Sequence, residues 1–271
     1  MRDNGRHMYR FLLSPKWLFG HGLVAVAVLG FVSLGFWQLD RHEQRSARNA
    51  LVAERMQAPP ADLAAVADKA GEDLAYRRVR LSGRYLPAGE VLLTPRSWNG
   101  QPGHHVLTPL ATDDGWAVLV ARGWVPFALD SPPVAEAAPP RGQVRVSGLV
   151  FPDEPATRFA PAIPSEGELI RVSRVDVERL QRQIDVPLRP YYVQLAEQTP
   201  ATVGELPRSA DPPELTAGNH LSYAVQWFLF AAVVALGYPA LIRRTALDEV
   251  RERPGDGISP VPIEAGNPSK G

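Results

Sequence analysis

Cysteine is absent from the 271-residue sequence, and the only methionines are Met1, Met8 and Met56. Without thiols the chain forms no disulfide, so any domain outside the cytoplasm must be stabilised by its own hydrophobic core. The same absence excludes a thiolate site for copper or zinc, a CxxC redox pair and covalent attachment of haem. A carrier that binds copper through methionine thioethers is also disfavoured.

A net charge is lacking as well, because 29 Lys and Arg balance 29 Asp and Glu. No positive field is available to attract phosphates, and we expect no nucleic-acid partner. The enzyme motifs G-x-S-x-G, Walker loop and H-E-x-x-H are missing too. The adjacent His104 and His105 would point to opposite faces of a strand, so they cannot easily chelate one ion. The sequence predicts a protein that is not an enzyme.

Long apolar runs are present at 17–39 and 221–242, and neither contains Asp, Glu, Lys or Arg. About 22 residues form a helix of roughly 33 Å, enough to cross a hydrocarbon core of about 30 Å. Both runs are predicted to be transmembrane helices. The basic leader 1–16 allows a signal peptide as the alternative for the first run. Its apolar part is longer than a signal h-region of roughly 7–15 residues, however, and no small-residue cleavage site follows.

Basic residues at the ends of the second run predict the orientation. Arg243, Arg244, Arg251 and Arg253 follow it, whereas residues 200–219 before it contain one arginine. Cytoplasmic flanks carry the excess of Lys and Arg. Both termini are therefore predicted to lie in the cytoplasm, although arginines after the first run weaken the signal there. Residues 40–219 would lie outside the cytoplasm.

The intervening sequence predicts one α+β domain of mostly antiparallel strands. Runs of alternating apolar and polar residues are separated by turn sequences such as "NGQPG" and "DDG". The predicted strands are 76–85, 90–98, 104–112, 116–125, 143–151, 169–173 and 191–197, with a short helix at 175–184. The first helix is predicted to continue to about residue 56, before a short helix bounded by prolines. The predicted fold is thus a membrane α+β protein in which two transmembrane helices flank an extracytoplasmic domain.

These patterns divide the chain into segments. The predicted segments are the basic leader 1–16, transmembrane helix 17–39, helical extension and linker 40–75, α+β domain 76–197, tether 198–220, transmembrane helix 221–242 and disordered cytoplasmic tail 243–271.

One stripe of the second apolar helix begins with a histidine. On a helix, His220, Tyr223, Ala224, Trp227 and Ala231 lie on one side. An aromatic belt with a polar helix cap explains this pattern without any ligand. Alternatively, His220 ligates a metal cofactor through a neutral ring nitrogen, and haem suits the neighbouring aromatic and small residues.

The first helix carries a second group of residues at the same predicted membrane face. Trp37 and Gln38 lie near its outer end, and Arg41 follows one turn later. If the helices are antiparallel neighbours, this group meets the 220–227 segment. Arg41 could then pair with a haem propionate, or it could be a snorkelling anchor. His21 lies roughly 25 Å away by helical rise and cannot join this site.

Three blocks of the sequence resemble the surfeit locus protein 1 family. They are "LGFWQLDR", "GHHVLTPLATDDGWAVLVARGWVP" and "NHLSYAVQWFLFA", and they occur in the family's order. The resemblance implies a bacterial plasma-membrane protein, or alternatively one of the mitochondrial inner membrane, that assembles haem-copper cytochrome c oxidase. It implies that haem a is bound by His220 as axial ligand of the iron, beside Trp227, and inserted into the oxidase catalytic subunit.

The sequence also predicts further partners and leaves two other functions open. The lipid bilayer is one expected partner, and enzymes of haem a synthesis are another. As an alternative function, the outer domain docks oxidase subunits or these enzymes as a scaffold, and His220 only caps a helix. A membrane-anchored enzyme is the third hypothesis, and it would require a buried pair of carboxylates that the sequence does not reveal.

Overall fold

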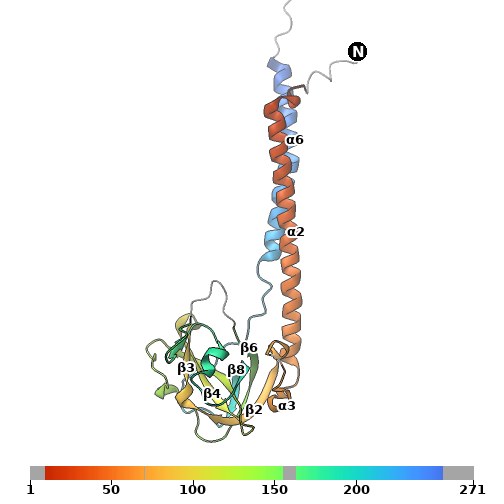
Figure 1. Cartoon of the computed structure of the whole chain (residues 1–271). Helices are drawn as coiled ribbons and strands as arrows, with labels where there is room; N and C mark the ends of the chain where they lie inside the picture. Colours follow the sequence, from red (N-terminus) through yellow and green to blue (C-terminus); the bar gives the residue numbers. More distant parts are fainter. Residues whose placement is uncertain (1–9, 70, 155–162, 253–271) are drawn as a thin grey trace, which may run out of the picture. The chain divides into compact units, whose positions relative to one another are not determined.

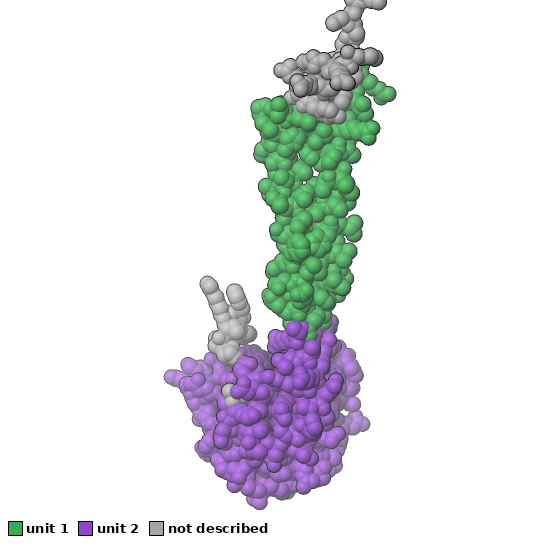
Figure 2. All heavy atoms as spheres, turned by 90° about the vertical axis from the view of Figure 1, so that its right-hand side faces the viewer, with its two compact units in different colours: residues 1–46, 217–271 green, residues 47–216 purple. Residues whose placement is uncertain are grey.

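The computed structural model describes residues 10–69, 71–154 and 163–252. Most of the predicted basic leader, residues 155–162 of the predicted α+β domain and the part of the predicted tail from residue 253 lie outside these residues. The chain forms two compact units, Met1–Ser46 with Ala217–Gly271 and Ala47–Thr216, which Figure 2 colours green and purple.

The first unit is built on two long helices that run side by side (Figure 1). The helix α2 spans Pro15–Gln57 after a short 3₁₀ turn, η1, at Arg10–Leu13, and α6 spans His220–Glu252. Their most apolar 18-residue windows have mean hydropathies of 2.0 and 1.9, and 6 % of each window is buried. Both helices are therefore long and apolar enough to span a membrane. The predicted helices 17–39 and 221–242, and the continuation of the first to about residue 56, are confirmed as helix. The prediction of a disordered tail from residue 243 is wrong for residues 243–252, which continue α6.

Residues spaced by three and four along each helix form the contact between α2 and α6. Such spacing keeps one face of each helix against its neighbour. On α2 the buried or half-buried residues of this face are Trp17, His21, Val24, Val28, Phe31, Gly35, Gln38 and His42. On α6 they are His220, Ala224, Trp227, Ala231, Val234, Tyr238 and Thr245. His21 contacts Tyr238 and Gln38 contacts His220, so the helices are antiparallel. We call these two rows the packed stripes.

The second unit is a mixed, mostly antiparallel sheet with short helices. The described strands are β1 Ala61–Asp62, β2 Arg78–Tyr85, β3 Val91–Trp98, β4 Gln101–Ala111, β5 Ala117–Pro126, β6 Val144–Pro152, β7 Arg171–Val172 and β8 Leu188–Thr199. The described short helices are α3 Leu63–Val66, α4 Gly71–Leu74, α5 Val177–Gln181 and the 3₁₀ turns η2 Pro87–Gly89 and η3 Ala135–Ala137. The seven predicted strands and the helix at 175–184 are confirmed within a few residues. The strand β1 was not predicted, and it precedes α3 in the segment where the sequence suggested a helix alone.

The sheet closes into a small barrel. The strand order is β1-β2-β6-β8-β5-β4-β3-β7, and β2 also pairs with β4 at Arg84–Ala111 and Tyr85–Leu110. Gly83 permits this closure, because a Cβ there would overlap the carbonyl oxygen of Ala111. Buried apolar side chains of the barrel strands, with Leu63 of α3 and Leu74 of α4, form the core inside.

Further apolar layers cover the barrel from outside, so that β5 is buried on both faces. Leu180 of α5 and Val172 of β7 pack with Leu93 and Leu119 in a second cluster. The proline-rich segment after β5 adds a third cluster, in which Val134 packs against Val106. This double covering explains why residues 117–121 of β5 are all apolar.

The two adjacent histidines of β4 have different surroundings, as their alternation on the strand predicts. His104 is buried and lies edge-on to the ring of Phe127, with ring centroids 4.7 Å apart. His105 lies on the other face and pairs in register with Trp124 of β5. No group of three potential ligands among the described His, Cys, Asp and Glu residues could hold a metal ion.

Burial of His105 predicts a loss of stability in acid. Burial, together with Arg96, lowers the pKa of His105 from 6.5 to about 4, and Asp211 opposes the shift. Between these pH values the unfolded chain binds more protons than the folded chain. The stabilisation is therefore complete above pH 6.5 and is lost as the pH falls towards 4. His105→Gln should flatten this decline in the free energy of unfolding, measured by denaturant titration of the full chain in detergent. Equal declines in both proteins would contradict the assignment, and measurements at pH 8 serve as the control.

Candidate functional site

His220 begins α6 and is held by a residue of the opposite helix. Its Nδ1 lies 2.8 Å from Oε1 of Gln38, a distance typical of a good hydrogen bond. Both residues belong to the packed stripes of the first unit, and both are half-buried. The backbone before the helix turns sharply at Gly218, which has a φ of 70°. The first turn of α6 therefore places the imidazole against α2.

The hydrogen bond leaves the other ring nitrogen available. If Nδ1 donates its proton to Gln38, Nε2 carries a lone pair and can bind a metal or accept a hydrogen bond. Gly218 lies along this edge of the ring, since a Cβ there would be 3.8 Å from Nε2 of His220. The same Cβ would be 3.2 Å from Nη1 of Arg45. A guanidinium thus lies close to the free edge of the imidazole, where it can pair with an anionic group.

Aromatic side chains pack below His220 between the helices. Trp227 lies two turns further along α6 and stacks on Phe31 of α2, with ring centroids 5.7 Å apart and planes at 25°. Ala224 lies between His220 and Trp227 and is fully buried. Gly35 allows the close approach of α2, because a Cβ there would meet the ring of Phe228 at 2.6 Å. The site therefore combines an imidazole with apolar aromatic walls.

The structure separates the predicted site residues into two groups. His220 and Trp227 lie on the packed stripe of α6. Tyr223 and Trp37 point away from it, with exposures of 48 % and 51 %. Arg41 is exposed as well, and its Nη1 donates to Oε1 of Gln44 at 3.2 Å. Tyr223, Trp37 and Arg41 thus lie outside the contact between the helices, where only a ligand on the outer surface of the pair could reach them.

On α2 the sequence assigned ligand contacts to Trp37 and Arg41; it placed Gln38 in the same group without a role and gave none to Arg45. Gln38, rather than the adjacent Trp37, contacts His220, and Arg45, rather than Arg41, lies beside Gly218. The spacing of Phe31, Gly35 and Gln38 along α2 contains the signal for the first of these, because residues three and four apart share a helix face. The position of Arg45 depends on the backbone before α6, which the sequence pattern does not specify.

His21, near the start of α2, differs from His220 in that both of its ring nitrogens are engaged. Nδ1 of His21 lies 2.7 Å from the hydroxyl of Tyr238, and Nε2 lies 3.2 Å from the carbonyl oxygen of Leu12. Trp17 packs against both rings. His21 therefore links the helices at the opposite end from His220, as expected from its distance along α2, and offers no free nitrogen to a ligand.

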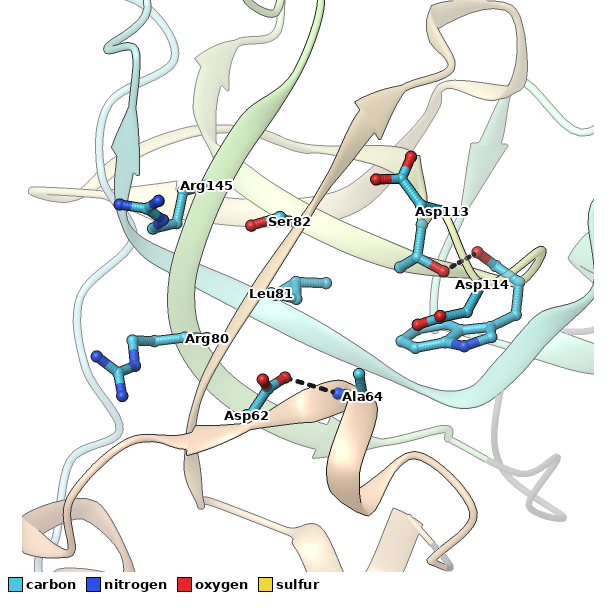
Figure 3. Close-up of a pocket in the computed structure, with 10 residues that line it drawn as sticks. Asp62, Ala64, Arg80, Leu81, Ser82, Asp113, Asp114 and Arg145 are labelled. Carbon is cyan, nitrogen blue, oxygen red and sulfur yellow. Dashed lines mark hydrogen bonds between the residues drawn. The ribbon is translucent and has the colours of Figure 1, made fainter.

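The second unit contains an open pocket of about 480 Å³, lined by residues of β2, β6 and the turn between β4 and β5. Figure 3 shows Asp113 and Asp114 on one side of it and Arg80 and Arg145 on the other. The described residues that line this pocket include no histidine, so Ser82 has no imidazole base there. Charges of both signs suit contacts with a polar partner surface.

Known proteins of one family are similar to this chain over most of its length. A model of the SURF1 family matches residues 25–232. An uncharacterized SURF1-like protein of Mycobacterium tuberculosis is 31 % identical over 264 residues, which cover 94 % of each chain. SURF1-like proteins of Rickettsia felis and Monosiga brevicollis are 26 % and 28 % identical, over 83 % and 82 % of this chain and 97 % and 87 % of their own. The resemblance in three sequence blocks is thereby confirmed, and the chain belongs to the SURF1 (surfeit locus protein 1) family.

Proposed function

We propose that the protein is a membrane-bound carrier that holds haem a through His220 and passes it to the catalytic subunit of cytochrome c oxidase. The observation that carries this proposal is the 2.8 Å contact between Nδ1 of His220 and Gln38, which leaves Nε2 beside Gly218. Membership of the SURF1 family is consistent with oxidase assembly. The proposed role is non-enzymatic, because a carrier binds and releases its cargo unchanged. Enzymes of haem a synthesis are the proposed donors.

The residues around His220 fit a haem in three respects. A haem iron requires a neutral imidazole nitrogen, and the hydrogen bond to Gln38 leaves one. The macrocycle requires apolar walls, which Trp227 offers within the helix pair and Tyr223 and Trp37 offer on its outer surface. The propionates require cations, and Arg41 and Arg45 lie one turn apart on α2.

The proposal includes insertion of α2 and α6 into the bacterial plasma membrane, with the mitochondrial inner membrane as the alternative. Both helices exceed the length of a bilayer core, and the arginines after the apolar part of α6 favour a cytoplasmic C-terminus. The second unit then lies outside the cytoplasm, and His220 lies at the outer membrane surface.

The test is the haem a content of the oxidase in cells that lack this protein and receive a plasmid-borne variant. With His220→Ala, we expect haem a in the purified catalytic subunit to fall to the level of the empty plasmid. His21→Ala is the matched control, because His21 lies in the same helix pair and has no free nitrogen. Restoration by His220→Ala to the wild-type level would contradict the carrier function.

A scaffold function is the second candidate, and the pocket of the second unit supports it. In this case the barrel docks oxidase subunits or haem-synthesis enzymes, with the opposite charges of Arg80, Arg145, Asp113 and Asp114 as contacts. The scaffold predicts that His220→Ala leaves oxidase assembly intact. If the protein is a scaffold, the double variant with Arg80→Glu and Arg145→Glu would abolish oxidase assembly. If it is a carrier, the same variant would bind haem as the wild type does.

Gly218 provides a separate prediction for the carrier. At a φ of 70° an alanine is strained, and its Cβ would be 3.2 Å from Arg45. Relief of the strain requires movement of the first turn of α6, which carries His220. We expect Gly218→Ala to weaken haem a binding by about 5- to 30-fold, equivalent to roughly 1–2 kcal/mol. The measurement is an optical titration of the purified apoprotein. Gly237→Ala is the control, because no atom lies within 4 Å of a Cβ there; equal affinities of the two variants would refute the prediction.

A further inference from the structure

We infer that Gln38 is a positioning residue for His220: its side-chain oxygen holds the imidazole in the tautomer with the proton on Nδ1 and thereby presents Nε2 as the ligating atom. The part of this inference that concerns haem rests on the proposed function. The part that concerns the tautomer does not, because it follows from the contact between two protein side chains. It also assigns a role to the glutamine of the first sequence block.

The geometry of the contact supports a specific hydrogen bond. Oε1 of Gln38 is 2.8 Å from Nδ1 of His220, and the two residues are 182 positions apart in the chain. An amide oxygen only accepts hydrogen bonds, so the nitrogen facing it must carry the proton. Both side chains are half-buried between helices, where a hydrogen bond is stronger than in water. The tautomer of a histidine is set by the bond that one of its nitrogens makes.

The position of Gln38 on α2 explains why this residue, rather than a neighbour, makes the contact. Phe31, Gly35 and Gln38 follow one another on the packed stripe of α2. Trp227 stacks on Phe31, and His220 contacts Gln38. Gly35 brings the helices close together, since a Cβ there would meet the ring of Phe228 at 2.6 Å. At this separation a glutamine spans the gap to the ring. Trp37 is half exposed and points elsewhere.

A neutral acceptor suits a ligand that must later release its metal. Partners that hydrogen-bond the second nitrogen of a ligating histidine fix the ring orientation and raise the basicity of the ligand. A carboxylate does so more strongly than an amide, because a charged acceptor makes the stronger bond. Gln38 thus orients His220 while keeping its basicity moderate. Gln38→Glu should therefore bind haem at least as tightly as the wild type and lower the reduction potential of the iron.

The first experiment measures the tautomer without haem. The full-length apoprotein, labelled with ¹⁵N-histidine, is placed in lipid nanodiscs at pH 8, and the signals of His220 are assigned by their loss in His220→Ala. We expect the proton on Nδ1 in the wild type and a shift towards Nε2 in Gln38→Leu. Unchanged signals of His21, which contacts Tyr238, report that the helix pair is intact. A wild-type ring protonated on Nε2, or a tautomer that is the same in Gln38→Leu, would overturn the inference.

The second experiment titrates the same proteins with haem a. Gln38→Leu should lose affinity by about 10- to 100-fold, the usual effect of removing such a partner, and Gln38→Glu should restore it with a lower potential. Gln226→Leu is the matched control, because Gln226 lies on the exposed side of α6. If wild type and Gln38→Leu bind with equal affinity and potential, the positioning role is refuted and the carrier survives. If no protein binds haem but the tautomer shifts as stated, the carrier is refuted and the tautomer assignment stands.

Discussion

Arg122→Met is expected to destabilise the second unit by about 3–5 kcal/mol, because it leaves the charge of Glu90 buried without a cation. The side chains of Arg122 and Glu90 are fully buried, and Nη2 of Arg122 lies 3.0 Å from Oε2 of Glu90. Nε of Arg122 donates to Oγ1 of Thr108 at 2.8 Å, and Nη2 also donates to the carbonyl oxygen of Ala137 at 2.6 Å. Glu90 in turn accepts from the backbone N–H of Val134 at 2.8 Å. The network thus fastens the proline-rich segment after β5 to the barrel.

Two controls separate this effect from a general loss of arginine. Arg171→Met breaks an exposed ion pair, in which Nη1 lies 3.3 Å from Asp130, and should cost less than about 1 kcal/mol. The double variant with Arg122→Met and Glu90→Leu removes both buried charges and should recover much of the loss. The measurement is denaturant unfolding of the full chain in detergent, followed by tryptophan fluorescence. If Arg122→Met is no less stable than Arg171→Met, the buried network does not stabilise the fold.

Gly123→Ala has the second large expected effect, because the segment around Arg208, between β8 and α6, docks on this residue. Gly123 has a φ of 140°, and a Cβ there would overlap the carbonyl oxygen of Arg208. Trp124 and Arg208 exchange two backbone hydrogen bonds, of 2.7 and 2.9 Å. We expect strain of roughly 1–3 kcal/mol, together with about 1 kcal/mol for each hydrogen bond that is lost. The same unfolding measurement tests this.

The matched control for Gly123 is Gly115, which has a φ of 81° and no atom within 4 Å of its Cβ position. Gly115→Ala therefore carries the strain without the clash and should cost clearly less than Gly123→Ala. Limited proteolysis between β8 and α6 provides a second readout, since release of Arg208 should expose this segment to cleavage. Equal stabilities and equal cleavage of the two variants would show that the segment does not depend on Gly123.

These two predictions assign a structural role to residues 122–126, the "RGWVP" end of the second sequence block. Arg122 holds the segment after β5 against the barrel, and Gly123 leaves room for the segment around Arg208. Trp124 is buried and stacks on Trp98, with ring centroids 5.7 Å apart. Damage to the block should therefore abolish function through loss of folded protein. Damage at His220 should abolish it in a protein that is folded. Comparing protein level with oxidase activity for both classes of variant separates stability from haem transfer.

The sequence was sufficient for most elements of the fold. Both long helices followed from apolar runs without charge, and the strands of the second unit followed from alternating residues and turn sequences. The hairpin between β4 and β5 was predicted from "DDG", and Gly115 adopts the positive φ that such a turn requires. These features are local, and the residues that specify them are adjacent in the chain.

Features that depend on distant residues were not predicted. The barrel closes because Gly83 lets β2 approach β4, and β8 pairs with β5 in parallel, neither of which is encoded by local periodicity. The pairing of Glu90 with Arg122 joins residues on different strands. In the helix pair, Gln38 faces α6 whereas the adjacent Trp37 is exposed. Which of the two faces α6 depends on the rotation of α2 about its axis.

The measurement that tests the central claim most directly is an optical spectrum of the purified full-length protein, co-expressed with the enzymes of haem a synthesis. The carrier predicts a haem a band in the wild type that is lost or shifted in His220→Ala and retained in His21→Ala. If wild type and His220→Ala are both colourless, or equally coloured, His220 does not hold the haem, and the scaffold function takes its place.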